Sequence, residues 1–291
     1  MGSGSWTPSS YASYSVANKK SYDASTHRVS GQVFHKSSLD DSLNPRLFSI
    51  RECVNAEEHP NTIPIILALD VTGSMGRSCK ETAEALGVIM TDLYKKYKDI
   101  EFCIMGIGDL AYDEAPIQMS QFESDVRIAE ALDKIFMEHG GGGNAYESYT
   151  AAWYMGLRRT SLDRITKNGK KGIIITMGDE PLNPYLPKDE LNYAIKGSEQ
   201  GDIDTKQLYK EASEKFDIYH IAVKDDHNCY GRYADRIKES FGEYLGQRLK
   251  ISTVNELSNT ITECIDDSLA AEGVMPEQPA NMVNENGDIQ W

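Results

Sequence analysis

Uninterrupted apolar runs, separated by segments with helical periodicity, constrain the fold of this chain more than any other feature. Residues 63–69 and 102–107 are almost wholly apolar, and shorter runs of the same kind occupy 173–176 and 218–223. Strands that are apolar on both faces are typical of a parallel sheet covered by helices on both sides. The sequence therefore predicts an α/β fold with a Rossmann-like, doubly wound, mostly parallel sheet.

The segments between these runs complete the expected domain. Helices are predicted over 78–97, 125–138, 146–158, 205–215 and 230–244, and a last helix follows Ser252 or Thr253 and ends near residue 270. A short strand is expected at 249–251, and an antiparallel edge strand at 117–122 after a turn. Residues 1–45 are predicted to form an arm that is flexible or forms short strands packed on the domain. Residues 46–271 are predicted to form the domain and 272–291 an acidic tail.

Composition excludes several classes of function. The chain has 291 residues and a formal net charge of −15, whereas a nucleic-acid binder needs a basic surface. Its five cysteines are scattered without a Cys-x-x-Cys pair, which favours free thiols in a reducing compartment. No run approaches the ~20 apolar residues of a membrane span. Because the N-terminus also lacks the pattern of a signal peptide, we expect a cytoplasmic protein with no membrane contact.

The first apolar run is followed by a carboxylate and two hydroxyls, each two residues apart. These are Asp70, Thr72 and Ser74, in the segment Asp-Val-Thr-Gly-Ser-Met-Gly. In an extended turn, residues at this spacing can point to one side. They would offer one anionic and two neutral oxygens to a hard cation such as Mg²⁺. An ion with so few anionic ligands can accept another carboxylate, which a partner protein could supply.

Polar residues also follow the other predicted strands. They are Asp109, Asp179, Glu180, Asp225, Asp226 and His227. Parallel strands bring the loops at their carboxyl ends to one edge of the sheet, where function collects in open α/β folds. One such acid can be a helix cap, but several at the same edge favour a cation site.

The segment from Asp70 to Ser74 resembles the metal-ion-dependent adhesion site of von Willebrand factor A (vWA) domains, whose pattern is Asp-x-Ser-x-Ser. The resemblance extends over about residues 63–270 in the order of the elements. It implies a domain that binds Mg²⁺ or Mn²⁺ and recognises a protein, often through a Glu or Asp of that partner. Thr72 and Ser74 would then bind the ion directly, and Asp70 directly or through water.

The second and third loops depart from the family pattern. In the second loop the family has a Thr after a Gly pair, whereas the Gly-rich segment 140–143 here puts Gly143 at that position and Asn144 after it. The acid of the third loop, Asp179, comes two residues late. We hypothesise that Asn144 or Glu147, together with Asp179, completes the site. The alternatives are that Asn144 caps a helix and that Glu147 lies in the first turn of that helix.

Three functions remain open at this stage. The first is an intracellular adaptor, because the Gly-rich segment resembles vWA proteins associated with alpha-kinases or with MoxR-type AAA+ ATPases. The second is a vWA scaffold whose metal site has degenerated. The third is a metal-dependent hydrolase similar to Asp-x-Asp-x-Thr phosphatases, but Thr72 stands where that chemistry needs an acid. We therefore expect a binding protein and not an enzyme.

Overall fold

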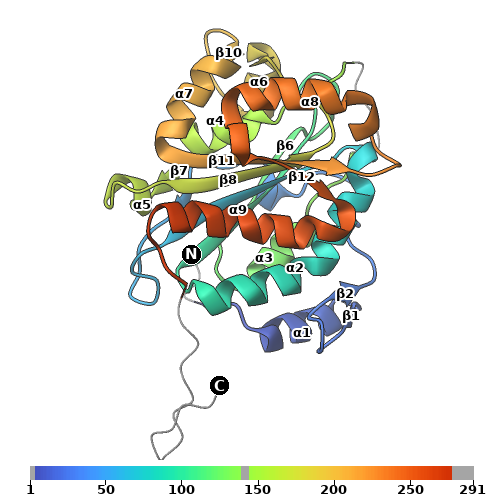
Figure 1. The fold of residues 1–291 in the computed structure, drawn as a ribbon, viewed down its shortest axis with the longest axis vertical. Helices are drawn as coiled ribbons and strands as arrows, with labels where there is room; N and C mark the ends of the chain where they lie inside the picture. The colour runs from blue at the N-terminus through green and yellow to red at the C-terminus, as the bar shows by residue number, and fades with distance from the viewer. Residues whose placement is uncertain (1–3, 139–143, 277–291) are drawn as a thin grey trace, which may run out of the picture.

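A six-stranded sheet forms the centre of the computed structural model, which describes residues 4–138 and 144–276 (Figure 1). The strand order is β12-β11-β8-β4-β5-β6, and every neighbouring pair is parallel except β5 and β6. The strands are β4 (Ile63–Asp70), β5 (Ile100–Ile107), β6 (Ile117–Met119), β8 (Gly172–Gly178), β11 (Phe216–Lys224) and β12 (Leu249–Thr253). The predicted fold class, including the antiparallel edge strand, is confirmed.

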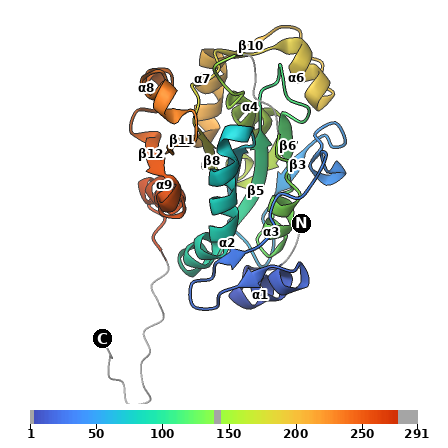
Figure 2. The ribbon, with the colours of Figure 1, turned by 90° about the vertical axis from the view of Figure 1, so that its right-hand side faces the viewer.

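Helices cover both faces of this sheet (Figures 1 and 2). One face carries α2 (Gly76–Lys96), α3 (Arg127–Asp133) and α9 (Leu257–Ala271), and the other carries α4 (Thr150–Arg158), α6 (Lys188–Ile195), α7 (Thr205–Lys215) and α8 (Tyr230–Leu245). Strand β4 shows why both layers form. Its Ile65 and Leu67 belong to one hydrophobic core, whereas Ile66 and Ala68 belong to the other.

Short elements surround the main layers. They are the pairs β1 (Ser21–Tyr22) with β2 (Val29–Ser30), β3 (Arg51–Cys53) with β7 (Thr160–Leu162) and β9 (Tyr185–Leu186) with β10 (Ile203–Asp204), and helix α5 (Asp163–Thr166). Single 3₁₀ turns η1 (Asp41–Leu43), η2 (Gly73–Met75), η3 (Gly246–Arg248) and η4 (Val254–Glu256) complete the set. Elements of two to four residues are too short to show a period, so the sequence does not give their positions.

The N-terminal arm, predicted to be flexible, instead contains helix α1 (Pro8–Ala17), which packs beside α2 (Figure 2). Tyr11 of this helix is only 1% exposed. Gly87 of α2 makes the contact possible, because a Cβ there would lie 2.5 Å from the Tyr11 ring. The small residues of α1 give little amphipathic pattern, which is why the sequence did not reveal it.

Polar contacts also attach the arm to the domain. Asp133, at the end of α3, accepts hydrogen bonds from Tyr14 at 2.6 Å and from the Lys20 ammonium at 2.6 Å. The side chains of Lys20 and Asp133 are 6% and 10% exposed, so this ion pair is buried. A buried pair of this kind is costly to break, because the remaining charge would lose its partner.

The start of the predicted acidic tail is also attached to the domain. Glu272 accepts a hydrogen bond from the Arg164 guanidinium at 2.6 Å, and Val274 packs against the core. Residues 277–291 of the predicted tail lie outside the described residues. All five cysteines lie within the described part of the chain and are free thiols. No helix in that part is long and apolar enough to span a membrane.

Candidate metal centre

The candidate site lies at the topological switch point of the sheet, where the chain stops adding strands on one side of β4 and starts adding them on the other. The chain continues from β4 to β5 on one side, and the later strand β8 pairs with β4 on the other. In open α/β sheets the crevice outside such a switch point is the usual binding place. Asp70 ends β4, and because Leu69 pairs with Met177, Asp70 and Gly178 stand at the same level of the sheet.

The first loop curls around the Asp70 carboxylate, which is fully buried. Its Oδ1 accepts hydrogen bonds from the Thr72 amide at 3.0 Å and the Thr72 hydroxyl at 2.5 Å. Its Oδ2 accepts a hydrogen bond from the Tyr149 hydroxyl at 2.7 Å. Asp70 therefore orients Thr72. Ser74 lies two residues later, in the 3₁₀ turn η2.

Asp179 of the third loop meets Ser74 despite its shifted position in the sequence. The Ser74 hydroxyl donates to Asp179 Oδ1 at 3.2 Å, and the Cys229 amide donates to Oδ2 at 2.7 Å. The side chains of Thr72, Ser74 and Asp179, with Asp70 behind them, thus gather at the switch point. Asp225, by contrast, faces Arg77 at 3.0 Å, and His227 is exposed.

The second loop contributes a buried carboxylate near this group. Glu147 is 4% exposed, and within the described residues its Oε2 has no hydrogen-bond partner. Helix α4 begins at Thr150 and not at residue 146, so Glu147 does not lie in the first turn of a helix. It forms an isolated bridge with Leu182 instead.

Asn144 does not cap α4 either. Its side-chain oxygen accepts a hydrogen bond from the Tyr146 amide at 3.2 Å. Asn144 is exposed. The preceding Gly-rich segment, 140–143, lies outside the described residues.

Several buried acids lie close together at this edge of the sheet, and their pKa values are raised. Burial, reinforced by the charge of Asp179, raises the pKa of Asp70 to about 8. Burial and the charges of Asp70 and Asp113 raise the pKa of Glu147 to about 11. The pKa of Glu180 is raised to about 7 and that of Asp113 to about 6, again chiefly by burial. A bound cation would favour the ionised forms of these groups.

The donor set suits a hard cation. In the part of the chain that the structure describes, no three His, Cys, Asp or Glu side chains are grouped to hold a metal ion by themselves. An ion would therefore depend on the hydroxyls of Thr72 and Ser74 together with Asp179, an all-oxygen set of the kind that Mg²⁺ prefers. Burial raises the pKa of the Cys229 thiol to about 11, so this thiol stays protonated and is a poor ligand for a softer metal.

Tyr149 is the main residue that sequence reasoning missed. Its hydroxyl donates to Asp70 and also accepts from the Glu180 amide at 3.3 Å, so it links the first and third loops. A Cβ at Gly178 would lie 2.0 Å from this hydroxyl. A glycine at the end of a buried strand is the one sequence signal of such a close approach.

Comparison with known proteins gives structural matches of low sequence identity. No protein-family model and no curated protein matches the chain. The pilus adhesin SpaC from Lactobacillus rhamnosus GG, in its open conformation, aligns with 10% identity over 72% of this chain, with a TM-score of 0.44. The vWF domain of the type V pili tip protein Mfa5 from Porphyromonas gingivalis aligns with 9% identity over 76% of this chain and 99% of that domain, with a TM-score of 0.42.

This chain spans only 30% of the length of SpaC. Both TM-scores lie below 0.5 and both identities are at most 10%. The fold class therefore rests on the strand order and helix layers of this chain and not on these matches.

Proposed function

We propose that this chain is a protein-binding module that holds Mg²⁺ or Mn²⁺ at the switch point and uses it to engage a carboxylate of a partner protein. Thr72, Ser74 and Asp179 would contact the ion, and Asp70 would orient Thr72 or bind through water. The observation that carries the proposal is the meeting of Ser74 with Asp179 at 3.2 Å beside the Asp70–Thr72 pair.

The chemistry follows from the ligand set. A divalent ion held by neutral hydroxyls keeps positive charge that protein oxygens have not neutralised. That charge is available to an Asp or Glu side chain from outside, which is why a partner protein is the expected ligand. The buried acids behind the site, among them Glu147, would attract the cation once its charge has favoured their ionised forms, without having to contact it.

The vWA resemblance supports proposals about the compartment, the partner and the lack of catalytic activity. We propose that the protein is cytoplasmic, that its partner is a component of an AAA+ ATPase or kinase system, and that it has no catalytic activity of its own. The alternative is a scaffold that binds partners independently of metal, and the departures in the second and third loops favour it. A metal-dependent hydrolase is less well supported, because Thr72 takes the place of the acid that this reaction needs.

Thermal unfolding in EDTA, Mg²⁺ and Mn²⁺ tests the proposal. An ion at ~100 times its dissociation constant stabilises the folded state by about 2.7 kcal/mol, which corresponds to roughly 5–10 °C for a chain of this size. We expect Ser74→Ala to lose this shift and Ser213→Ala, a serine on the remote helix α7, to keep it. The absence of any shift in the wild type would support the metal-independent scaffold.

A further inference from the structure

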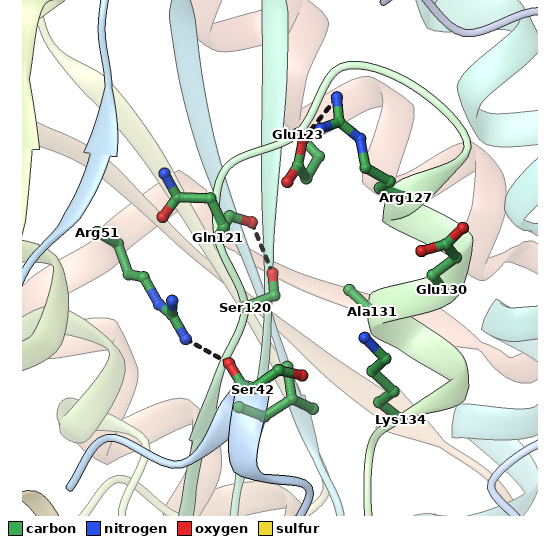
Figure 3. A pocket seen from close by; sticks show the side chains of 10 residues that line it. Ser42, Arg51, Ser120, Gln121, Glu123, Arg127, Glu130, Ala131 and Lys134 are labelled. Carbon is green, nitrogen blue, oxygen red and sulfur yellow. Dashed lines mark hydrogen bonds and ion pairs between the residues drawn. The ribbon is translucent and has the colours of Figure 1, made fainter. Parts of the chain in front are cut away.

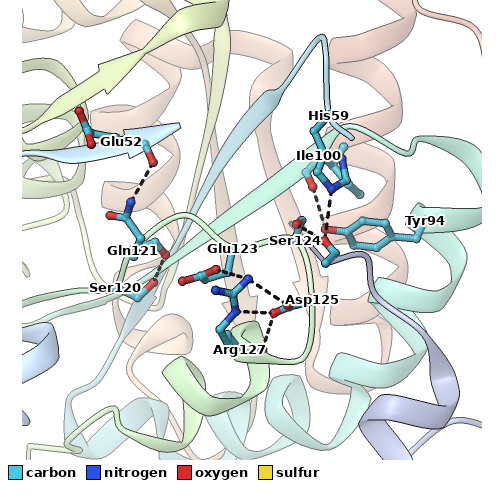
Figure 4. Close-up of polar contacts among 11 residues, drawn as sticks. Glu52, His59, Tyr94, Ile100, Ser120, Gln121, Glu123, Ser124, Asp125 and Arg127 are labelled. Atoms are coloured by element: carbon cyan, nitrogen blue, oxygen red, sulfur yellow. Dashed lines mark hydrogen bonds and ion pairs between the residues drawn. The ribbon is translucent and has the colours of Figure 1, made fainter. Parts of the chain in front are cut away.

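Two arginines of helix α8 differ from all the others in this chain. Every other arginine donates at least one side-chain hydrogen bond to a carboxylate or a backbone carbonyl. Arg51, for example, donates to a backbone carbonyl (Figure 3), and Arg127 is held between two carboxylates (Figure 4). By contrast, the guanidinium groups of Arg232 and Arg236 make no hydrogen bond and no ion pair with any residue that the structure describes.

These two side chains lie side by side on the surface. Both are exposed, and both lie over the ring of Tyr233, with 5.2 Å from the Arg232 guanidinium to the ring centroid and 5.4 Å from that of Arg236. Because they are four residues apart, they are neighbours on one face of the helix. The acids of the same turns, Asp235 and Glu239, form no ion pair with either arginine within the described part of the chain. One aromatic ring therefore holds two cations together in solvent.

The arginine pair lies next to the candidate metal centre. Cys229 directly precedes α8, and its amide donates to Asp179 at 2.7 Å. Burial raises the pKa of Glu180, the next residue, and the charge of Arg236 is close enough to lower it in part. A rise of 1.5 Å per residue puts Arg232 and Arg236 about 5 and 10 Å along the helix from Cys229. Helical side chains tilt toward the N-terminus of their helix, which here is the end at the metal centre.

We infer that the partner presents an acidic segment to this edge, with one carboxylate on the metal ion and a second between Arg232 and Arg236. This inference rests on the proposed function, because the ion holds the first carboxylate. In an extended segment, side chains two residues apart face the same way and lie about 7 Å apart. An Asp-x-Asp pair therefore spans the step from the metal centre to the arginines, where a guanidinium offers two donors that match a carboxylate.

The arginine pair also accounts for how an acidic segment can approach this chain. The formal net charge of −15 repels anions at long range, and Glu180 adds a carboxyl group beside the metal centre. Two exposed cations next to the ion offset this repulsion where the segment would bind. They are too few to neutralise the phosphates of a nucleic acid, so a short acidic peptide fits this surface better.

NMR chemical-shift titration of the full chain with two short peptides tests the inference. One peptide is Gly-Ser-Asp-Gly-Asp-Ser-Gly, and in the other Asn replaces the second Asp. With Mg²⁺ at low salt, the wild type should bind the two-acid peptide about fivefold more tightly, because exposed ion pairs each contribute little. The double variant Arg232→Gln/Arg236→Gln should bind both peptides equally. The control Lys95→Gln/Lys167→Gln removes two exposed lysines elsewhere and should keep the preference.

The Mg²⁺-dependent thermal shift separates this inference from the proposed function. The arginine double variant should keep the shift of the wild type, which also shows that the variant is folded. The inference is overturned if this variant retains the fivefold preference. It is also overturned if a wild type that shows the shift binds both peptides equally, or binds neither below about 10 mM. A wild type without the shift refutes the proposed function itself, and the inference with it.

Discussion

Replacing Asp70 with Asn should stabilise the metal-free protein and, at the same time, abolish its response to Mg²⁺. Asp70 is fully buried, and the nearest charge that acts on it is that of another carboxylate, Asp179. An asparagine has the same shape, and its side-chain oxygen can accept the two hydrogen bonds from Thr72. Its amide can donate to the Tyr149 hydroxyl, which would turn from donor to acceptor.

The size of the effect follows from the pKa of Asp70, which burial raises from 3.8 to about 8. Between these values the folded state holds a proton that the unfolded chain has released, so the stability of the wild type falls as pH rises. The resulting cost is about 4 kcal/mol at pH 7 and about 2 kcal/mol at pH 5. The asparagine variant would not carry this cost, so it should exceed the wild type in stability by up to these amounts in EDTA.

Urea unfolding at pH 5 and pH 7, with EDTA and with Mg²⁺, measures both effects. Saturating Mg²⁺ should stabilise the wild type by about 2.7 kcal/mol at ~100 times its dissociation constant and leave Asp70→Asn unchanged. Asp226→Asn, at an exposed position after β11, is the matched control. The reasoning is refuted if Asp70→Asn is less stable than the wild type in EDTA at pH 7, or if its advantage does not shrink at pH 5.

Three further predictions concern residues around the two cores. Burial lowers the pKa of His220 from 6.5 to about 3. The free energy of unfolding should therefore decrease as pH falls below 6.5, by about 2 kcal/mol at pH 5. Urea unfolding should show that His220→Gln removes this part of the pH dependence. Gly178→Ala should displace Tyr149 and remove the Mg²⁺-dependent thermal shift, whereas Gly231→Ala, where a Cβ meets nothing within 4 Å, should retain it. Lys20→Met should lower the free energy of unfolding by about 3 kcal/mol, because it leaves Asp133 buried without its cation. An unchanged urea midpoint for this variant would contradict a structural role for the arm.

The sheet could be predicted from the sequence because each long strand is buried on both faces. β4 and β5 are buried at every position, and their apolar runs need no partner to be recognised. Helix α1 and the pair β3–β7 could not be predicted in the same way. Their stability comes from a few specific contacts, such as Tyr11 against Gly87, which depend on residues far away in the chain.

The candidate metal site likewise combines residues of one short loop with residues that only the fold brings together. Asp70, Thr72 and Ser74 lie in one short loop, so their spacing already places them together. Glu147 was expected in a helix, but the helix begins later, and only the fold shows that its carboxylate is buried and without a hydrogen-bond partner in the described structure. Tyr149 carries no motif at all, because its role depends on the space that a glycine in another strand leaves open.

That glycine also explains why no acid stands directly before Asp179. Parallel pairing of Leu69 with Met177 sets Gly178 beside Asp70. An acid at position 178 would stand where the Tyr149 hydroxyl now lies, since even a Cβ there would be 2.0 Å from it. With Tyr149 holding Asp70, the next residue, Asp179, is the first that can turn toward Ser74, and it does so at 3.2 Å. The position of Asp179 is therefore coupled to Tyr149, and we expect a chain with a smaller residue in place of Tyr149 to accommodate an acid at position 178.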